Sequence, residues 1–106
     1  MDRQEFLRRA DACLARVEDA LQDFDPDELD YASSDGVLTL EFADKKRYVL
    51  NRQTATNQMW FAAGASAWHF AWDAANDRWI DDKGGRELFA LVADEVAKKL
   101  GRGVKI

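Results

Sequence analysis

The spacing of apolar residues changes twice along this chain, and that change limits the fold more than any other feature. Over residues 6–24 the apolar side chains recur with the 3.6-residue period of a helix, with Val17 near the middle of the stripe. Between residues 37 and 80 they alternate with polar side chains, as in half-buried strands. The helical period returns over residues 86–100. The pattern therefore predicts a helix, a series of strands and a second helix.

Five alternating segments, separated by short turn sequences, make up the middle of the chain. They cover residues 37–42, 47–53, 57–63, 67–72 and 78–80. Connections this short join antiparallel neighbours. Because both helical stripes must be buried, we expect an α+β fold. It would be a two-layer α/β sandwich with an antiparallel sheet of about five to six strands, covered on one face by the N- and C-terminal helices.

The composition fits a single domain spanning residues 1–106. Apolar residues make up 47% of the chain and charged residues 33%, which excludes an intrinsically disordered chain and a membrane protein. Asp2, Arg3 and Glu5 stand where a secretory leader would need basic and apolar residues. The only cysteine, Cys13, fits a reducing compartment. We therefore expect a cytoplasmic protein.

Acidic residues are concentrated between positions 18 and 30, where no Lys or Arg occurs. This stretch carries a charge of −7, whereas the other residues hold 15 basic and 13 acidic groups, a net charge of +2. Such a field attracts cations or basic protein surfaces and repels nucleic acid and anionic membranes. The alternative is a face that only keeps the chain in solution. We call these seven residues the acidic ridge: Glu18, Asp19, Asp23, Asp25, Asp27, Glu28 and Asp30.

The ligand chemistry of the ridge predicts weak metal binding. Its carboxylates are hard oxygen ligands, but the segment that begins at Asp23 fails the calcium-loop pattern. Glu28 occupies the sixth position, where glycine is needed, and Ser34 the twelfth, where a bidentate glutamate is needed. We therefore expect weak, unselective binding of divalent or trivalent cations. Arg16 precedes Asp19 by three residues and is placed to pair with it.

Strand alternation predicts a second candidate surface on the sheet. If Leu50 and Met59 point into the core, the residues next to them in the strands point outward. A Trp among side-chain amides on such a face is typical of a binding hot spot. The alternative is that this Trp is partly covered and has no role. We expect the histidine to be an ordinary surface residue. The outward-facing residues are Asn51, Gln53, Gln58, Trp60 and His69.

The segment at residues 51–60, NRQTATNQMW, resembles the signature strand pair of the frataxin family in the spacing of its Asn-basic-Gln and Gln-apolar-Trp triplets. The segment GVLTL at 36–40, the pair His69-Phe70, the acidic first helix and the closing helix extend the likeness to nearly the whole chain. The bacterial members are the nearest in pattern. The resemblance implies an α+β sandwich, binding of ferrous and ferric iron, and a role in iron–sulfur cluster assembly.

By position, the resemblance implies weak iron binding at the surface carboxylates Glu18, Asp19, Asp23, Asp25, Asp27 and Asp30. It implies binding of a cysteine desulfurase and the iron–sulfur scaffold assembly through Glu18, Asp19, Asp23, Asn51, Gln53 and Trp60. The expected role is a non-enzymatic regulator of the desulfurase, and iron donation is a further role that has been proposed for the family. The alternative is a ferroxidase or iron-storage protein using the same acids, although no histidine near the ridge would complete a di-iron site. We expect a monomer, with iron-dependent oligomers as a further state.

Overall fold

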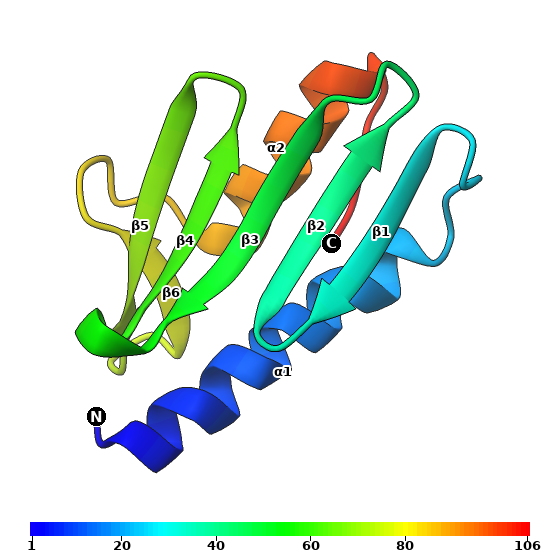
Figure 1. The fold of residues 1–106 in the computed structure, drawn as a ribbon. Helices are drawn as coiled ribbons and strands as arrows, with labels where there is room; N and C mark the ends of the chain where they lie inside the picture. Colours follow the sequence, from blue (N-terminus) through cyan, green and yellow to red (C-terminus); the bar gives the residue numbers. More distant parts are fainter.

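The computed structural model describes all 106 residues and has two layers, a sheet and a pair of helices (Figure 1). All six strands pair antiparallel with their neighbours in sequence order. Both helices lie on the same face of the sheet, so the predicted α+β sandwich is confirmed. The elements are α1 (Arg3–Leu21), β1 (Leu29–Ser34), β2 (Val37–Phe42), β3 (Arg47–Gln53), the 3-10 turn η1 (Thr54–Thr56), β4 (Gln58–Ala63), β5 (Ser66–Asp73), β6 (Arg78–Asp81) and α2 (Leu88–Leu100).

Helix α1 is shorter at its C-terminal end than the apolar stripe suggested. It is capped by Asp2, whose carboxylate accepts a hydrogen bond from the Glu5 N–H at 2.8 Å, and it ends at Leu21. The predicted stripe ran on to Phe24, which does pack against the core but from the loop that follows the helix. Pro26 disfavours the helical conformation just before it, and the chain has already turned by then.

Strand β1 is the element that the alternation did not predict. Leu29 is its only fully buried residue, Tyr31 packs against the edge of the core, and the rest of its sequence is polar or small. It forms because it is hydrogen-bonded to β2 across a two-residue turn, in which Asp35 and Gly36 adopt φ values of 49° and 80°. The sheet therefore has six strands, with β1 at one edge, and Asp30 of the acidic ridge lies within a strand.

One hydrophobic core fills the space between the two layers. It contains 20 buried apolar residues, and its largest fully buried side chains include Trp79, Phe6, Phe61 and Phe70. The rings of Phe6 on α1 and Trp79 on β6 meet edge to face at 6.0 Å and join the helix layer to the sheet. No helix in the structure has the length and apolar character needed to cross a membrane.

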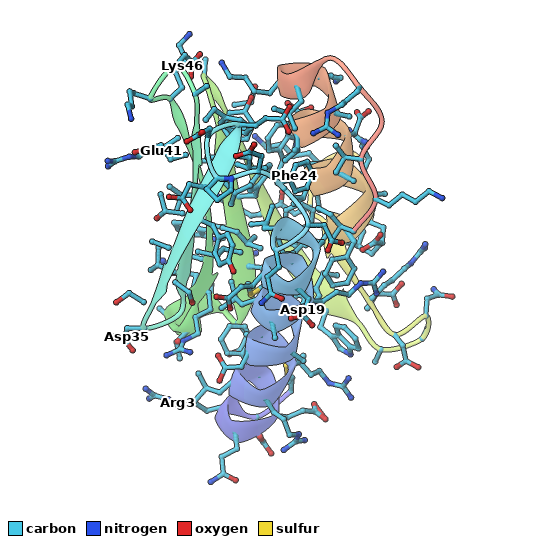
Figure 2. All side chains as sticks on the ribbon, turned by 90° about the vertical axis from the view of Figure 1, so that its right-hand side faces the viewer. Arg3, Asp19, Phe24, Asp35, Glu41 and Lys46 are labelled. Atoms are coloured by element: carbon cyan, nitrogen blue, oxygen red, sulfur yellow. The ribbon has the colours of Figure 1, made fainter.

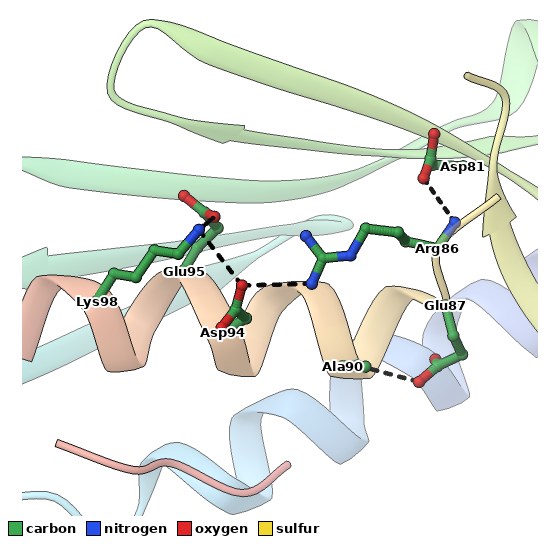
Figure 3. Close-up of polar contacts among 7 residues, drawn as sticks. All are labelled: Asp81, Arg86, Glu87, Ala90, Asp94, Glu95 and Lys98. Atoms are coloured by element: carbon green, nitrogen blue, oxygen red, sulfur yellow. Dashed lines mark hydrogen bonds and ion pairs between the residues drawn. The ribbon is translucent and has the colours of Figure 1, made fainter. Parts of the chain in front are cut away.

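The loop from β6 to α2 is held by one buried carboxylate. Asp81 is 5% exposed and accepts hydrogen bonds from the backbone N–H groups of Lys83, Gly84 and Arg86 at 2.9, 2.6 and 2.8 Å. Figure 3 shows the one from Arg86. Glu87 then caps α2 by accepting from the N–H groups of its first turn, so the helix begins at Leu88, two residues after the predicted start. The loop thus fixes where α2 begins.

Candidate functional site

The acidic ridge runs from the last turns of α1 through the following loop to the start of β1. Asp19 extends from α1 in the helix layer, on the other side of the molecule from Glu41 in the sheet (Figure 2). Glu18 and Glu28 are half-buried, and the five aspartates of the ridge are exposed. The structure thus places all seven residues along one continuous segment at the α1 and β1 side of the molecule.

Ridge carboxylates have almost no basic partners. Twelve ion-pair contacts occur in the structure, and only the one between Glu28 and Arg102 involves the ridge. The predicted pair of Arg16 and Asp19 is wrong. Arg16 lies instead 4.0 Å over the ring of Phe89 on α2 and donates a hydrogen bond to the Ile106 main-chain oxygen at 3.1 Å. The negative charge of the ridge is therefore left uncompensated by the rest of the chain.

Two of the ridge aspartates also hold the local backbone. Asp25 Oδ1 accepts a hydrogen bond from the Asp27 N–H at 2.9 Å, and Asp30 Oδ1 accepts one from the Tyr31 N–H at 2.9 Å. The carboxylates of Asp19 and Asp23 make no hydrogen bond with the protein. Asp19 and Asp23 are therefore free to bind an external cation, whereas substitution of Asp25 would also disturb a turn.

Ridge carboxylates do not converge. No group of three or more His, Cys, Asp or Glu side chains is placed to hold one metal ion. The arrangement offers single, separated carboxylates to the solvent. Such oxygen atoms bind a hydrated cation through one or two contacts, which gives low affinity and little selectivity.

The second predicted surface lies on the outer face of the sheet, away from the helices. The register places Asn51, Trp60 and His69 side by side on β3, β4 and β5, and Gln53 opposite Gln58 in the next row. The predicted sharing of one face by these residues is confirmed. Because Trp60 is half-buried among polar neighbours, its ring offers apolar area at the surface.

Trp60 is held in one orientation by two contacts. Its ring stacks on that of His69, with centroids 4.2 Å apart and planes inclined by 15°. Its Nε1–H donates to Gln58 Oε1 at 2.9 Å. A ring fixed in this way loses little side-chain freedom when a partner binds over it, which favours binding.

His69 has an acidic partner that the sequence did not reveal. Asp82 Oδ2 lies 3.9 Å from His69 Nδ1, and the Asp82 N–H donates to the His69 carbonyl oxygen at 2.9 Å. Asp82 follows β6, so its position beside His69 depends on the pairing of β5 with β6. The alternation of the strands, which predicts an ordinary surface histidine, therefore does not predict this neighbouring acid.

Arg52, the basic residue between Asn51 and Gln53, is directed to the opposite face. Its guanidinium lies 2.7 Å from Asp11 Oδ1 on α1 and 3.6 Å from Asp35 Oδ1 in the turn between β1 and β2. It therefore ties the helix layer to the sheet edge. The two amides beside it are left on the outer face.

The sequence matches known proteins over nearly its full length. Residues 1–102 match the model of the frataxin-like domain family. A protein of Paraburkholderia xenovorans named iron-sulfur cluster assembly protein CyaY is 36% identical over 104 residues, which cover 98% of this chain and 96% of that protein. A protein of Dechloromonas aromatica with the same name is 35% identical over 105 residues, covering 98% and 97%.

Solved structures match the fold as well. Frataxin from Psychromonas ingrahamii superposes with a TM-score of 0.88 at 28% identity, covering 99% of this chain and 97% of that one. A trimeric frataxin from the yeast Saccharomyces cerevisiae, complexed with ferrous iron, superposes with a TM-score of 0.74 at 30% identity, covering 89% and 87%.

Proposed function

Because the chain belongs to the frataxin family, we propose that it binds iron and regulates a cysteine desulfurase during iron–sulfur cluster assembly. Relatives that match over almost the whole chain are named for that assembly, and a yeast frataxin of similar fold was solved with ferrous iron. The acidic ridge is the proposed iron-binding surface. The same ridge and the outer face around Trp60 are the proposed docking surfaces for the desulfurase and its scaffold.

A single observation supports this proposal most. Eleven of the twelve ion-pair contacts lie outside the ridge, although the ridge carries seven of the 20 acidic residues. Carboxylates that a fold does not use in its own ion pairs are available to ligands. Asp19 and Asp23 stand four residues apart around the end of α1, where like charges are mutually unfavourable. A cation bound at either carboxylate should therefore stabilise the protein.

Iron is expected to be a weakly held cargo on the ridge. Exposed, separated carboxylates leave most of the hydration shell of the ion in place, so exchange with a partner protein is fast. We propose Glu18, Asp19, Asp23, Asp25, Asp27 and Asp30 as the contributing ligands. Because this iron is weakly bound, the protein could release it to the proteins that assemble the iron–sulfur cluster.

Partner docking would use charge and apolar contact together. The ridge steers a basic surface of the desulfurase into place, and that steering weakens at high salt. The fixed ring of Trp60, flanked by Asn51 and Gln53, supplies a short-range anchor with amide hydrogen bonds around it. For a partner that covers both surfaces, the ridge would raise the rate of association and the contacts around Trp60 would lengthen the lifetime of the complex.

Metal binding is tested by an NMR titration with ferrous iron under anaerobic conditions. The D19N/D23N variant removes two ridge charges whose carboxylates serve no other purpose in the fold. We expect the amide signals of residues 18–30 to respond in the natural sequence and the response to weaken at least about threefold in the variant. The matched control is D35N/D77N, which removes two charges at turn positions where φ is 49° and 50° and Asn is tolerated. Equal weakening in both variants would contradict a ridge-specific site.

Docking is tested with the cysteine desulfurase of the same organism at two salt concentrations. We expect D19N/D23N to weaken binding by about tenfold or more at low salt, with a smaller effect at high salt. Unchanged affinity would refute docking through the ridge.

The competing activity is oxidation of ferrous iron at the same acids, and it is distinguished by measuring oxygen consumption. Catalytic turnover of oxygen that D19N/D23N abolishes would favour the enzyme.

A further inference from the structure

A cavity unrelated to the ridge and to the outer sheet face opens between α1, the turn of the β5–β6 hairpin and the first turn of α2. Its volume is about 230 Å³. We propose that it binds a small organic anion: a carboxylate or phosphate attached to a planar ring. Three arginines, Arg9, Arg16 and Arg78, together with the rings of Trp72 and Phe89, provide the chemistry for that ligand.

Basic side chains outnumber acidic ones on the wall of this cavity. Three arginines and one acid, Asp77, line it, and the acids Glu5 and Asp73 stand just outside, 3.8 Å from Arg9 and 3.7 Å from Arg78. Every guanidinium carries five N–H donors. Guanidinium groups on the wall of a partly enclosed cavity offer N–H donors to an anion, so the cavity is suited to a ligand different from those of the ridge.

Most of the arginine donors have no acceptor within the protein. Only Arg16 makes a hydrogen bond, to the Ile106 main-chain oxygen at 3.1 Å. The nearest acids to the other two stand farther than a hydrogen bond allows: Glu5 is 3.8 Å from Arg9, and Asp73 is 3.7 Å from Arg78. The Nε atom of Arg9 is buried and has no partner. An oxyanion in the cavity would supply the missing acceptors.

Two of the guanidinium groups are held in place before any ligand arrives. Arg9 lies 4.4 Å from the centroid of the Trp72 ring, and Arg16 lies 4.0 Å from that of Phe89. Their spacing on α1 is seven residues, two helical turns, so both extend from the same face of the helix. Ala12, which lies between them in the lining, is small and leaves the space open. Little side-chain freedom is then lost on binding.

The inner part of the cavity is apolar and uncharged. Trp79 and Cys13 form it, and both are buried. Burial, with a smaller contribution from the Glu87 carboxylate, raises the pKa of Cys13 to about 12, so the thiol is neutral at physiological pH and adds no negative charge. Arginine forks bind carboxylates and phosphates in a bidentate manner. A single ring with one such group matches the volume, which is smaller than that of typical drug-sized sites.

The test is an NMR titration of the full chain with four probes: benzoate, phenyl phosphate, the neutral benzamide and inorganic phosphate. We expect one or both ring anions to shift the Trp72 indole signal and the amides of Arg78 and Phe89. Benzamide and inorganic phosphate should bind at least about fivefold more weakly, because benzamide lacks the negative charge and inorganic phosphate lacks the ring. The comparison of benzoate with phenyl phosphate shows which anionic group the cavity prefers.

Variants separate this site from non-specific anion binding. R9Q and R78Q should each weaken the ring anions at least about fivefold, and A12L should do so by filling the cavity without a change of charge. R8Q is the matched control, because Arg8 is exposed on the same helix and does not line the cavity. Equal binding of benzamide, an equal effect of R8Q, or shifts away from the cavity would each overturn the proposal. Thermal unfolding of each variant confirms that the fold is retained.

Discussion

Replacement of Asp81 by alanine should be among the most damaging single changes in this protein, although Asp81 is neither in the ridge nor in the apolar core. The carboxylate is 5% exposed and accepts three backbone hydrogen bonds, from Lys83, Gly84 and Arg86, at 2.6–2.9 Å. Those bonds shape the loop that begins α2. Alanine would leave three N–H groups in a confined loop without their acceptor.

The magnitude follows from the number of bonds lost. At about 1 kcal/mol for each hydrogen bond, D81A should lower the free energy of unfolding by about 3 kcal/mol. The Asn variant should cost less. Its amide oxygen can replace Oδ1, which serves Lys83 and Gly84, while its NH₂ group would face the N–H of Arg86 in place of Oδ2. D81N should therefore cost about 1–2 kcal/mol.

Urea unfolding at pH 7, followed by circular dichroism, measures both values. For a domain of this size, a loss of about 3 kcal/mol corresponds to a fall in Tm of about 12–24 °C. D82A is the matched control, because Asp82 is the exposed neighbour and its loss should stay within about 0.5 kcal/mol. A loss below about 1 kcal/mol in D81A, or equal losses in D81A and D81N, would refute the argument from backbone hydrogen bonds.

Asp81 also makes stability depend on pH in a defined window. Burial disfavours its charged form, but the N–H donors of Gly84, Arg86 and Lys83 and the charge of Arg86 outweigh it, so the pKa of Asp81 lies below its ordinary value. A lowered pKa contributes stability above the unfolded pKa of about 3.9 and loses it as the pH falls through the folded value. The natural protein should therefore lose more stability below about pH 4 than D81A does. Parallel pH profiles for the two proteins would contradict this.

Three further predictions concern other parts of the fold. In urea unfolding, W60A should cost about 1 kcal/mol, the value of a surface aromatic pair, and W79A about 3–5 kcal/mol from the core; equal costs would be inconsistent with the burial of the two rings. Cys13 is buried with a pKa of about 12, so at pH 8 a thiol reagent should label the native protein at least about a hundredfold more slowly than the urea-unfolded protein, and similar rates would argue against this. G36A should cost about 1–2 kcal/mol, because φ is +80° and a Cβ would lie 2.6 Å from Arg52 Nε; an unchanged urea midpoint would exclude that strain.

The sequence predicted the helices and strands whose apolar side chains recur with a clear period. Both helices and five strands bury one face each, so their period is visible in the apolar residues. Alternation also placed Trp60 and His69 on the outer face, because a strand leaves no other choice once its neighbours point inward.

The parts that it missed depend on contacts between distant segments. Strand β1 fully buries only Leu29, so its existence follows from backbone pairing with β2 and not from an apolar pattern. The spacing along α1 predicts a pair of Arg16 with Asp19, but Arg16 lies over the ring of Phe89 on α2 instead. The approach of Asp82 to His69 requires the β5–β6 pairing. Local spacing cannot predict such contacts.

Strand β1, which the apolar pattern missed, is also the element that joins the two candidate docking surfaces. Asp30 stands opposite Glu41 on β2, on the same outer face as the row of Asn51 and Trp60. Neighbouring strands are about 4.8 Å apart, and the row of Asp30 lies four residues along the strands from the row of Asn51 and Trp60, so Asp30 is roughly 20 Å from Trp60 across the sheet. A patch of ordinary interface size, about 800 Å² on each partner, spans that distance. Asp30, the last residue of the ridge, therefore reaches the outer face at the β1 edge of the sheet, and a partner of that size can contact both Asp30 and Trp60 without any change in the fold.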